Sequence, residues 1–370
     1  MRPHLGAEEA SAVAAAVESG WVAQGPRVAA FEEAFAAQVG ASHAVAVSSC
    51  TTGLHLALTV IGVGPGDEVV VPSLSFIATT NSVRYVGARP VFADVEPATG
   101  NLTAETVAAV ATPATRAVLL VHQGGVPADV EAIRGFCEPR GIALIEDAAC
   151  AVGSTYRGRP VGHCSPLAAW SFHPRKIVTT GEGGMVTTES AEHANRLRRL
   201  RDHGMSVSAA DRHASRQPVL EEYLELGFNY RMTDIQAALG LVQLRRLPEI
   251  VRRRRELAAR YHELLADVPG VVAVTDPPYG TTNYQSYWVL LDRDFPVSRN
   301  RLLQALADHG VSARRGIMAA HLEPACAGLS HGPLPVTERL TRSTVILPLF
   351  HDLTALQQDR VVDVIRSVAR

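Results

Sequence analysis

The feature of this sequence that most constrains its fold is a repeated alternation of short apolar segments with segments of helical periodicity. Helix-like segments lie around residues 7–19 and 27–39. Five apolar segments then follow, each with a helix-like segment after it: HAVAVSS, DEVVVPS, RPVFADV, RAVLLVH and IALIEDA. Strands separated by helices form mostly parallel sheets with helices on both faces. The pattern therefore predicts an α/β fold.

The second half of the chain predicts a smaller unit after two more strands. The segments AAWSF and GGMVTT bracket a turn that contains Lys176. A helix from about residue 232 is expected to end at Pro248, because proline cannot donate a backbone hydrogen bond. We therefore expect a large domain over residues 1–247 and a smaller α+β domain over residues 248–370. The segment Met205–Gly227 lacks periodicity, which predicts a long mobile loop.

Composition excludes several classes of protein. The formal net charge of −2 gives no reason to expect binding to nucleic acid or to an anionic membrane. The N-terminal segment does not resemble a signal peptide, and no apolar run is long enough to span a bilayer, so we expect a cytoplasmic protein. The five cysteines are scattered, which indicates neither a disulfide framework nor a zinc site.

Three motifs that resemble known sites are rejected. The segment GVGPG, from Gly62, follows a helix and precedes a strand, which is the reverse of the order in a dinucleotide site. The segment HLEPAC lacks the second cysteine of a zinc deaminase, so no metal site is predicted. The run Arg252–Arg255 lies within one helical turn, which is typical of a solvated helix face rather than of a polyanion site.

Polar residues at the ends of the apolar strands are the best candidates for a site. Ligands of open α/β sheets bind outside the carboxyl ends of the strands. One strand ends in Ser48 and Ser49, and the next helix opens with Thr51 and Thr52. Free N–H groups and hydroxyls at such a helix start can bind a phosphate. N-capping explains one of these hydroxyls but not the cluster.

Two further strands end in a pair of acids and in a lysine-containing turn. Glu146 and Asp147 end one strand, and a carboxylate there either caps a helix or faces a ligand. Because adjacent side chains of a strand point to opposite faces, only one of the two can face a given ligand. Ser171 and Lys176 precede TTGEGG, whose glycines permit a tight turn.

A phosphate cradle, a buried acid and a lysine are together the minimal set for pyridoxal 5'-phosphate. A lysine amine condenses with the aldehyde of this cofactor, and an acid keeps the pyridine nitrogen protonated. Only one of the two adjacent acids, Glu146 or Asp147, can take this position.

Five motifs resemble a known family. In order, they contain HAVAVSSCTTGLHLAL, GPGDEVVVPSLSFIATTNSVRYVGARPVFADV, EDAACAVGS, SFHPRKIVTTGEGGMVTT and GFNYRMTDIQAALGLVQLRRL. Together they resemble the DegT/DnrJ/EryC1/StrS aminotransferases, which are fold-type I enzymes that mostly aminate nucleotide-linked keto sugars. The resemblance implies a mostly parallel seven-stranded sheet sandwiched by helices. It also implies pyridoxal 5'-phosphate as cofactor.

The resemblance assigns roles in cofactor binding. Lys176 matches the Schiff-base lysine and Asp147 matches the partner of the pyridine nitrogen. Thr51, Thr52 and Ser171 match the phosphate cradle.

Four further residues receive roles from the same resemblance. Phe76 matches the aromatic residue that stacks on the cofactor ring, although it could equally belong to the core. Asn229 matches a residue that reaches the phosphate in the neighbouring subunit, although it could instead cap the next helix. Cys150 stands where many members carry a glutamine or histidine that approaches the cofactor's phenolic oxygen, and a thiol is a weaker partner. His321 matches a histidine of the substrate region.

The resemblance implies a homodimeric aminotransferase with shared active sites. The expected donor is L-glutamate or L-glutamine. The expected acceptor is a nucleotide-diphosphate keto-deoxysugar, in the biosynthesis of amino sugars or natural products. A keto-cyclitol or an aminohydroxybenzoate precursor remains an alternative. A sugar dehydratase of the same fold would carry histidine in place of Lys176, and a regulator that binds the cofactor without turnover is a further alternative.

Overall fold

A seven-stranded, mostly parallel sheet forms the centre of the molecule. The computed structural model describes residues 3–207, 218 and 220–369. The strand order is β1-β9-β8-β5-β4-β2-β3, and only the pairs that include β9 are antiparallel. The strands are β1 (His43–Val47), β2 (Glu68–Pro72), β3 (Arg89–Ala93), β4 (Thr115–Val121), β5 (Ala143–Asp147), β8 (Ala168–Ser171) and β9 (Gly184–Thr188). The predicted α/β fold class is confirmed.

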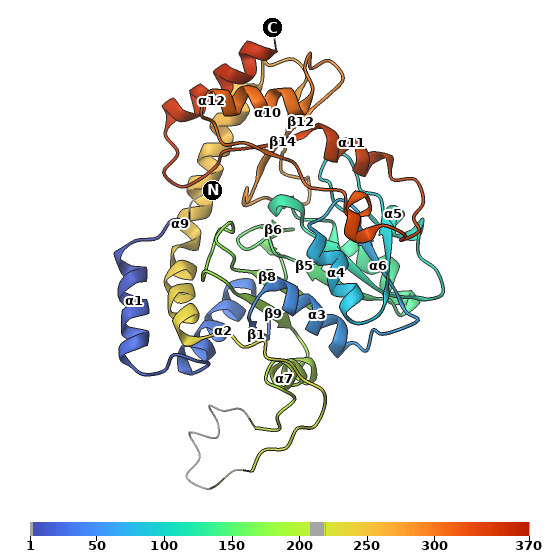
Figure 1. Cartoon of the computed structure of the whole chain (residues 1–370), viewed down its shortest axis with the longest axis vertical. Coiled ribbons are helices and arrows are strands. Elements are labelled where there is room, and N and C mark those ends of the chain that lie inside the picture. Colours follow the sequence, from blue (N-terminus) through green and yellow to red (C-terminus); the bar gives the residue numbers. More distant parts are fainter. Residues whose placement is uncertain (1–2, 208–217, 219, 370) are drawn as a thin grey trace.

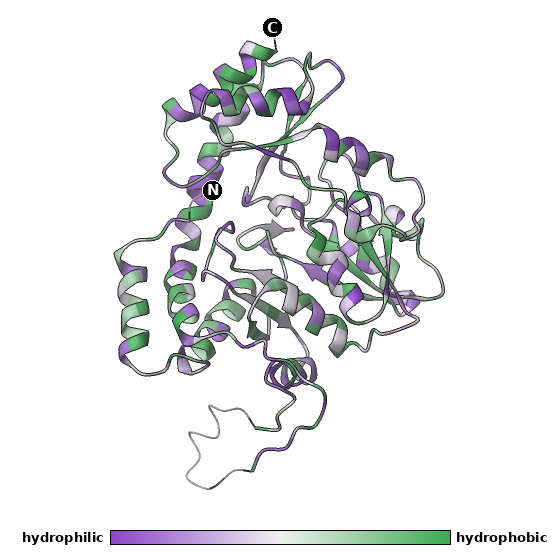
Figure 2. Cartoon of the chain, viewed as in Figure 1, coloured by the Kyte–Doolittle hydropathy of each residue, from purple (hydrophilic) through white to green (hydrophobic). Residues whose placement is uncertain are grey.

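Helices cover both faces of this sheet because successive side chains of each strand enter different apolar clusters. Along β1, Val45 and Val47 pack in one cluster, whereas Ala44 and Ala46 pack in another. Figures 1 and 2 show the strands enclosed by amphipathic helices. The helices of this part are α1 (Ala7–Glu18), α2 (Pro26–Val39), α3 (Cys50–Val60), α4 (Ile77–Tyr85), α5 (Ala104–Ala108), α6 (Val130–Cys137) and α7 (Ala191–Leu200).

The C-terminal part of the chain builds a smaller antiparallel sheet of four strands, in the order β10-β12-β14-β13. Its strands are β10 (Val271–Ala273), β12 (Tyr287–Leu291), β13 (Arg314–Arg315) and β14 (Thr344–Leu347). Its helices are α10 (Arg299–Asp308), α11 (Pro335–Ser343) and α12 (Ala355–Val368). A third small sheet joins β6 (Thr155–Tyr156), β7 (Arg159–Pro160) and β11 (Gly280–Thr281).

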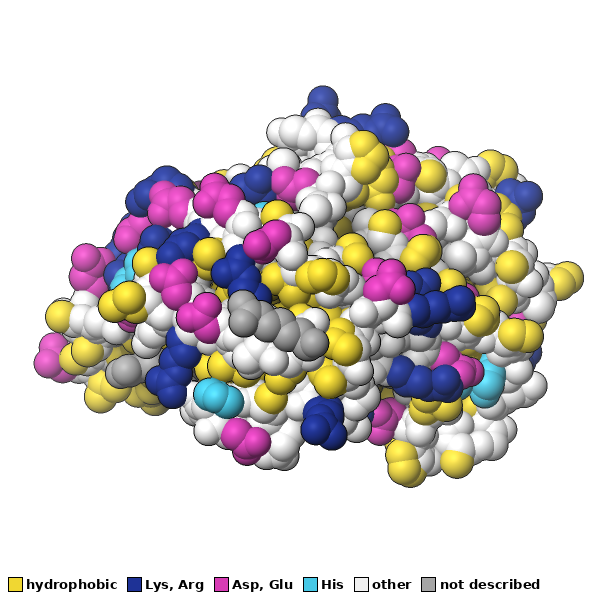
Figure 3. Space-filling model, turned by 90° about the horizontal axis from the view of Figure 1, so that it is seen from above, with side chains coloured by type: hydrophobic (Ala, Val, Ile, Leu, Met, Phe, Trp, Pro, Cys, Tyr) yellow, Lys and Arg dark blue, Asp and Glu magenta, His cyan; other side chains and the backbone are white. Residues whose placement is uncertain are grey.

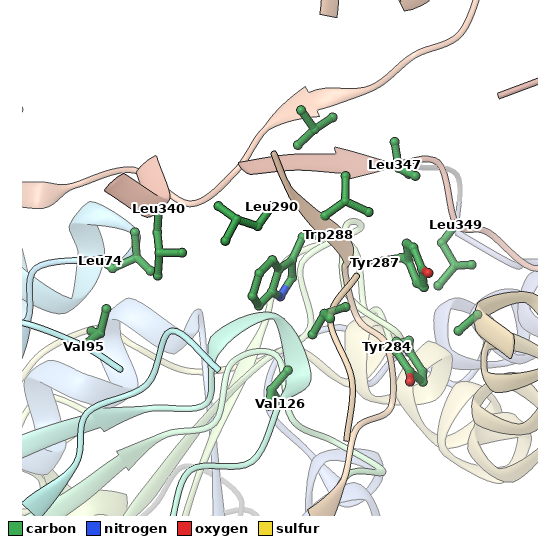
Figure 4. Packing of buried hydrophobic residues seen from close by; sticks show 14 of the residues in the cluster. Leu74, Val95, Val126, Tyr284, Tyr287, Trp288, Leu290, Leu340, Leu347 and Leu349 are labelled. Atoms are coloured by element: carbon green, nitrogen blue, oxygen red, sulfur yellow. The ribbon is translucent and has the colours of Figure 1, made fainter. Parts of the chain in front are cut away.

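One apolar cluster runs between the large and the small sheet. It includes Leu74 and Val126 from the large part together with Tyr287, Trp288 and Leu347 from the small sheet. Figure 4 shows the ring of Trp288 with Leu74 to its left, Val126 below it and Tyr287 to its right. The boundary between domains at residue 247 remains a prediction, since the two sheets share this core.

Helix α9 (Asp234–Leu265) does not end at Pro248, so that prediction was wrong. An interior proline costs about 3 kcal/mol because it removes one hydrogen bond and crowds the preceding turn. Pro248 is exposed, and the buried side chains Leu247 and Ile250 anchor the helix on both sides of it. Burial of these apolar side chains offsets the cost, and the helix continues from the large sheet to the small one (Figure 1).

The run Arg252–Arg255 does not form the predicted solvated face. Arg252 is exposed and pairs with Glu256, but Arg254 is buried. Arg254 can be buried because its guanidinium donates hydrogen bonds to backbone carbonyls that are far away in the sequence. Helical periodicity alone does not predict these contacts. On the face seen in Figure 3, basic and acidic side chains are interspersed.

The segment Met205–Gly227 is described only in part. Met205 forms a β-bridge with Tyr223, and the Ser206 N–H donates to the Glu222 carbonyl at 2.8 Å. Residues 208–217 and 219 of the predicted loop lie outside the described residues. Among the helices of the described ranges, none has both the length and the apolar composition needed to cross a membrane.

Glu9 fixes α1 to α9 and makes that contact dependent on pH. Its carboxylate accepts hydrogen bonds from the Gly6 N–H, from Gln243 and from Arg246, at 2.8 to 2.9 Å. Burial raises the pKa of Glu9, but these hydrogen bonds outweigh burial and lower it from 4.5 to about 2. The ionised carboxylate is therefore the form that the folded chain favours.

We predict that Glu9→Gln destabilises the protein at pH 7. A group with a lowered folded-state pKa contributes stability above its unfolded pKa, and that stability is lost as the pH falls through the folded pKa. The difference in free energy of unfolding between wild type and variant should therefore be full above pH 4.5 and shrink toward pH 2. Denaturant titrations at several pH values measure it. Glu8→Gln, at an exposed neighbouring position, is the control, and an unchanged difference at low pH contradicts the prediction.

Candidate active site

Lys176 lies in the turn that joins β8 to β9. The Lys176 N–H donates to the His173 carbonyl at 2.8 Å, and the Thr180 N–H donates to the Phe172 carbonyl at 2.9 Å. The Phe172 N–H donates to the Gly183 carbonyl at 2.9 Å, and this bond joins the two ends of the turn. These bonds hold the lysine at the carboxyl end of β8, where the sequence predicted it.

The Lys176 side chain points toward the end of β5. Its Nζ donates to the Cys150 Sγ at 3.1 Å. Burial lowers the pKa of Lys176, whereas neighbouring groups, Cys150 first among them, raise it, and the net shift is upward. The structure thus brings together Lys176, which the resemblance matched to the Schiff-base lysine, and Cys150, which it matched to a residue near the cofactor's phenolic oxygen.

Asp147 ends β5 and is buried beside the same lysine. Its Oδ2 accepts from the Thr79 hydroxyl at 2.9 Å, and its Oδ1 accepts from the Ala149 N–H at 3.2 Å. Cys50 Sγ lies 3.9 Å from Oδ1. Burial raises the pKa of Asp147, the hydrogen bond from Thr79 lowers it, and the net shift is upward. A cationic partner at this carboxylate would favour its ionised form.

Glu146 points to the other face of β5, as strand alternation predicts. Its Oε2 lies 3.0 Å from His122 Nε2, and both side chains are buried. His122 Nδ1 accepts from the Ala128 N–H at 3.1 Å, so Nε2 carries the proton and donates to Glu146. Burial raises the pKa of Glu146, but the bond from His122 outweighs burial and lowers it. Glu146 is therefore occupied within the fold.

The first turn of α3 offers free donors. Ser49 is the N-cap, and its Oγ accepts from the Thr52 N–H at 3.2 Å. The Thr52 hydroxyl donates to the Ser49 carbonyl at 2.7 Å, so that hydroxyl is already engaged in capping. Within the described residues, the N–H groups of Cys50 and Thr51 and the Thr51 hydroxyl have no protein acceptor. Thr51 therefore fits the predicted phosphate cradle better than Thr52 does.

Strand β9 joins the lysine turn to this helix start. Gly184 pairs with Ser171 of β8 and with Val47 of β1. A Cβ on Gly184 would lie 2.4 Å from the Ser49 carbonyl carbon and 2.6 Å from the Cys50 nitrogen. Only glycine permits this backbone contact, which places Ser171 beside the first turn of α3. The cradle of free N–H groups fits a phosphate.

Phe76 precedes α4 and is 64% exposed, so the alternative that it belongs to the core was wrong. The Phe76 carbonyl accepts from the N–H of Thr79, whose hydroxyl in turn contacts Asp147. An exposed aromatic side chain one turn from the buried acid fits a residue that covers a planar ligand. Stacking on the cofactor stays a prediction.

Asn229 and His321 lie outside this group of contacts. Asn229 is exposed and forms an isolated β-bridge with Asp202. Thr233 is the N-cap of α9, so the alternative that Asn229 caps this helix was wrong. His321 is buried, with its Nδ1 2.5 Å from the Ser73 hydroxyl and its Nε2 3.8 Å from a Glu338 carboxylate oxygen. Ser73 directly follows β2, so His321 lies at the same edge of the sheet. Its contact with substrate stays a prediction.

The sequence motifs did not indicate two features of the site. Thr79, which donates to Asp147, lies on α4 and has no local signal in the sequence. The amino-acid count indicates the reactive lysine more directly than the motifs do. Lys176 is the only lysine in the 370 residues, and every other long basic side chain is arginine. This count alone singles out Lys176 as the candidate for chemistry that needs a primary side-chain amine.

Comparison with known proteins agrees with this geometry. The model of the DegT/DnrJ/EryC1/StrS aminotransferase family matches residues 3–366. The aminotransferase TlmJ from Streptoalloteichus hindustanus is 41% identical, with 99% of this chain and 97% of that chain covered and a TM-score of 0.91. DesV from S. venezuelae is 36% identical, with 98% and 94% covered and a TM-score of 0.89. The chain belongs to this aminotransferase family.

A third similar structure is DesI, solved in the presence of its TDP-sugar product. It is 35% identical, with 100% of this chain and 91% of that chain covered and a TM-score of 0.89. The family assignment makes the chain an aminotransferase that depends on pyridoxal phosphate. The predictions of family, fold, enzyme class and cofactor are confirmed. The roles of the individual residues remain predictions, which the contacts of Lys176 and Asp147 and the free donors of Thr51 fit.

We predict that Asp147→Asn abolishes most of the transamination activity and that Glu146→Gln retains much of it. Opposite charges about 4 Å apart attract by about 4 kcal/mol at an effective dielectric of about 20, which corresponds to about three pKa units on the pyridine nitrogen. Only a carboxylate on the Asp147 face can supply this attraction, whereas glutamine at residue 146 can still accept from His122. Rates of half-transamination compare the variants, and the reverse ranking would contradict the assignment.

Proposed function

We propose that this aminotransferase moves an amino group from L-glutamate or L-glutamine to a keto sugar carried on a nucleotide diphosphate. The observation that carries the proposal is the meeting of the only lysine, a buried aspartate and an open helix start at one edge of the sheet. Similar proteins include DesI, which was solved with a TDP-sugar product. In line with this donor and acceptor, we propose that the reaction takes place in the cytoplasm.

Some residues of the site are proposed to bind the cofactor, and Lys176 is proposed to transfer a proton. Pyridoxal phosphate supplies an electron sink that stabilises a substrate carbanion. The N–H groups at the start of α3 and the Thr51 hydroxyl would bind its phosphate, and Asp147 would hold the proton on its ring nitrogen. Lys176 would hold it through its amine, and the same amine, once free, would take the proton from the donor's α-carbon. Cys150 Sγ lies 3.1 Å from the Nζ of this amine.

Screening of acceptors tests the proposed substrate. The purified enzyme should first lose its visible absorbance when L-glutamate is added, because the amino group passes to the cofactor. A nucleotide-linked keto sugar should then restore the absorbance, with a rate that a free keto sugar does not reach. Recovery with a keto-cyclitol alone would contradict the proposed acceptor, and no loss with either donor would contradict the donor assignment. Lys176→Ala is the control without reaction.

Shared active sites in a homodimer are the second part of the proposal. Asn229 is exposed at the end of a segment that also exposes Tyr223 and Leu226, at 66% and 84%. Exposed apolar side chains grouped in this way mark interaction surfaces. A two-fold contact through this segment would place each Asn229 in the opposite subunit's site.

We predict that co-expressed Lys176→Ala and Asn229→Ala chains recover activity that neither variant has alone. A mixed dimer would contain one site with both lesions and one intact site, so purified mixed dimers should have about half of the wild-type activity, and the unselected mixture of randomly paired chains about a quarter. Activity of the co-purified dimers, carrying two different affinity tags, measures the recovery. Asn229→Ala must first weaken cofactor retention by itself. Given that, mixed dimers without recovery would show that each subunit builds its own site.

A further inference from the structure

One loop from beyond α9 reaches the backbone on both sides of the contact between Lys176 and Cys150. The loop consists of Thr282, Asn283, Tyr284 and Gln285, and all four residues are buried. We refer to it as the 282–285 loop. Two of its side-chain amides donate to carbonyl groups next to the two reactive side chains.

Gln285 holds the peptide group that precedes the lysine. Its Nε2 donates to the Arg175 carbonyl at 2.6 Å. The other polar atom of the same peptide group, the Lys176 N–H, donates to the His173 carbonyl at 2.8 Å. Because both ends of this peptide plane are bonded, its rotation is restricted, and the direction in which the Lys176 side chain leaves the backbone is set.

Asn283 holds the peptide group that follows the cysteine in the same manner. Its Nδ2 donates to the Cys150 carbonyl at 2.8 Å and also to the Val152 carbonyl at 2.8 Å. The Ala151 N–H, at the other end of that peptide group, donates to the Ala148 carbonyl at 2.9 Å. The two peptide planes next to the Lys176 and Cys150 side chains are therefore both fixed by amides of one loop.

Two arginines of α9 hold the 282–285 loop itself. Arg254 donates to the carbonyls of Tyr284 and Gln285 at 2.6 to 2.9 Å. Arg255 donates to the Thr282 carbonyl at 2.7 Å. The buried part of the arginine run thus anchors this loop, which the prediction of a solvated face did not anticipate.

The loop is also strained and closely packed, which indicates that its position is determined by its surroundings. Tyr284 has a φ of +50°, a conformation that is costly for a residue other than glycine. A Cβ on Gly125 would lie only 2.0 Å from Asn283 Oδ1. Figure 4 shows Tyr284 beside Tyr287 in the apolar cluster that joins the two sheets. Strain of this kind persists only where packing and hydrogen bonds outweigh it.

We propose that Gln285 and Asn283 are positioning residues that set where the Lys176 amine and the Cys150 thiol meet. The inference rests on the proposed role of Lys176 and adds two residues, of which Gln285 acts through Lys176 and Asn283 through Cys150. Loss of the Gln285 amide would free the peptide group before Lys176, and a displacement of about 1 Å can slow a positioned reaction by about a hundredfold. Donor binding, which does not involve this peptide group, should change little.

The test compares Gln285→Met with Gln358→Met in the purified holoenzyme. Methionine keeps the length of glutamine but removes the amide donor. Gln358, on α12, is a matched control because it is buried and its Nε2 donates to the Leu257 carbonyl at 2.8 Å. We expect Gln285→Met to slow the half-reaction with L-glutamate at least about tenfold, at a nearly unchanged half-saturating donor concentration. Gln358→Met should lower the melting temperature without slowing the half-reaction.

A second readout does not depend on the substrate. The rate at which added pyridoxal phosphate becomes linked to Lys176 in the apoenzyme, measured by borohydride trapping, should fall in Gln285→Met and not in Gln358→Met. Equal rates in the two variants would overturn the inference. A wild type that traps the cofactor but does not react with either donor would contradict the proposed function instead. If Gln285→Met does not fold, Gln285→Asn, whose shorter amide cannot reach the Arg175 carbonyl, takes its place under the same criteria.

Discussion

The active site depends on how closely β9 approaches the first turn of α3. Gly184 makes this approach possible, because any side chain there would collide with the Ser49 and Cys50 backbone. The contact places the end of β8, and with it the turn of Lys176, next to the free N–H groups of α3. Asp147 reaches the same place from the neighbouring strand β5, which pairs with β8. One backbone contact therefore brings the free N–H groups of α3, a lysine and an acid to one edge of the sheet.

The parts of the site that lie at strand ends could be predicted from the sequence. Buried strands such as β2 and β5 are short apolar runs, and the residues that follow them in a parallel sheet meet at one edge. Strand alternation predicted that only one of Glu146 and Asp147 faces the ligand, and the family resemblance selected Asp147. The family resemblance added roles for Phe76 and Asn229, for which local patterns offered alternatives, and the structure removes those alternatives by exposing Phe76 and by capping α9 with Thr233.

The parts that could not be predicted depend on contacts between residues far apart in the chain. Pro248 lies inside a continuous helix because buried neighbours on both sides outweigh a local preference. Arg254 is buried because the carbonyls of a loop about thirty residues later accept hydrogen bonds from its guanidinium. Helical periodicity predicts neither the burial around Pro248 nor the hydrogen bonds of Arg254. The same holds for Gln285, whose amide reaches a carbonyl beside Lys176 across 110 residues of sequence.

Covalent attachment of the cofactor to Lys176 is the central claim, and the composition of the chain makes it directly measurable. Borohydride reduction of the holoenzyme, followed by proteolysis and mass spectrometry, locates any trapped pyridoxal group. Because the sequence has one lysine, the only other amine that could react is the N-terminus. We expect the added mass on the peptide that contains Lys176, and its loss in Lys176→Arg. A holoenzyme that carries the added mass only at the N-terminus, or traps none, would contradict covalent attachment to Lys176.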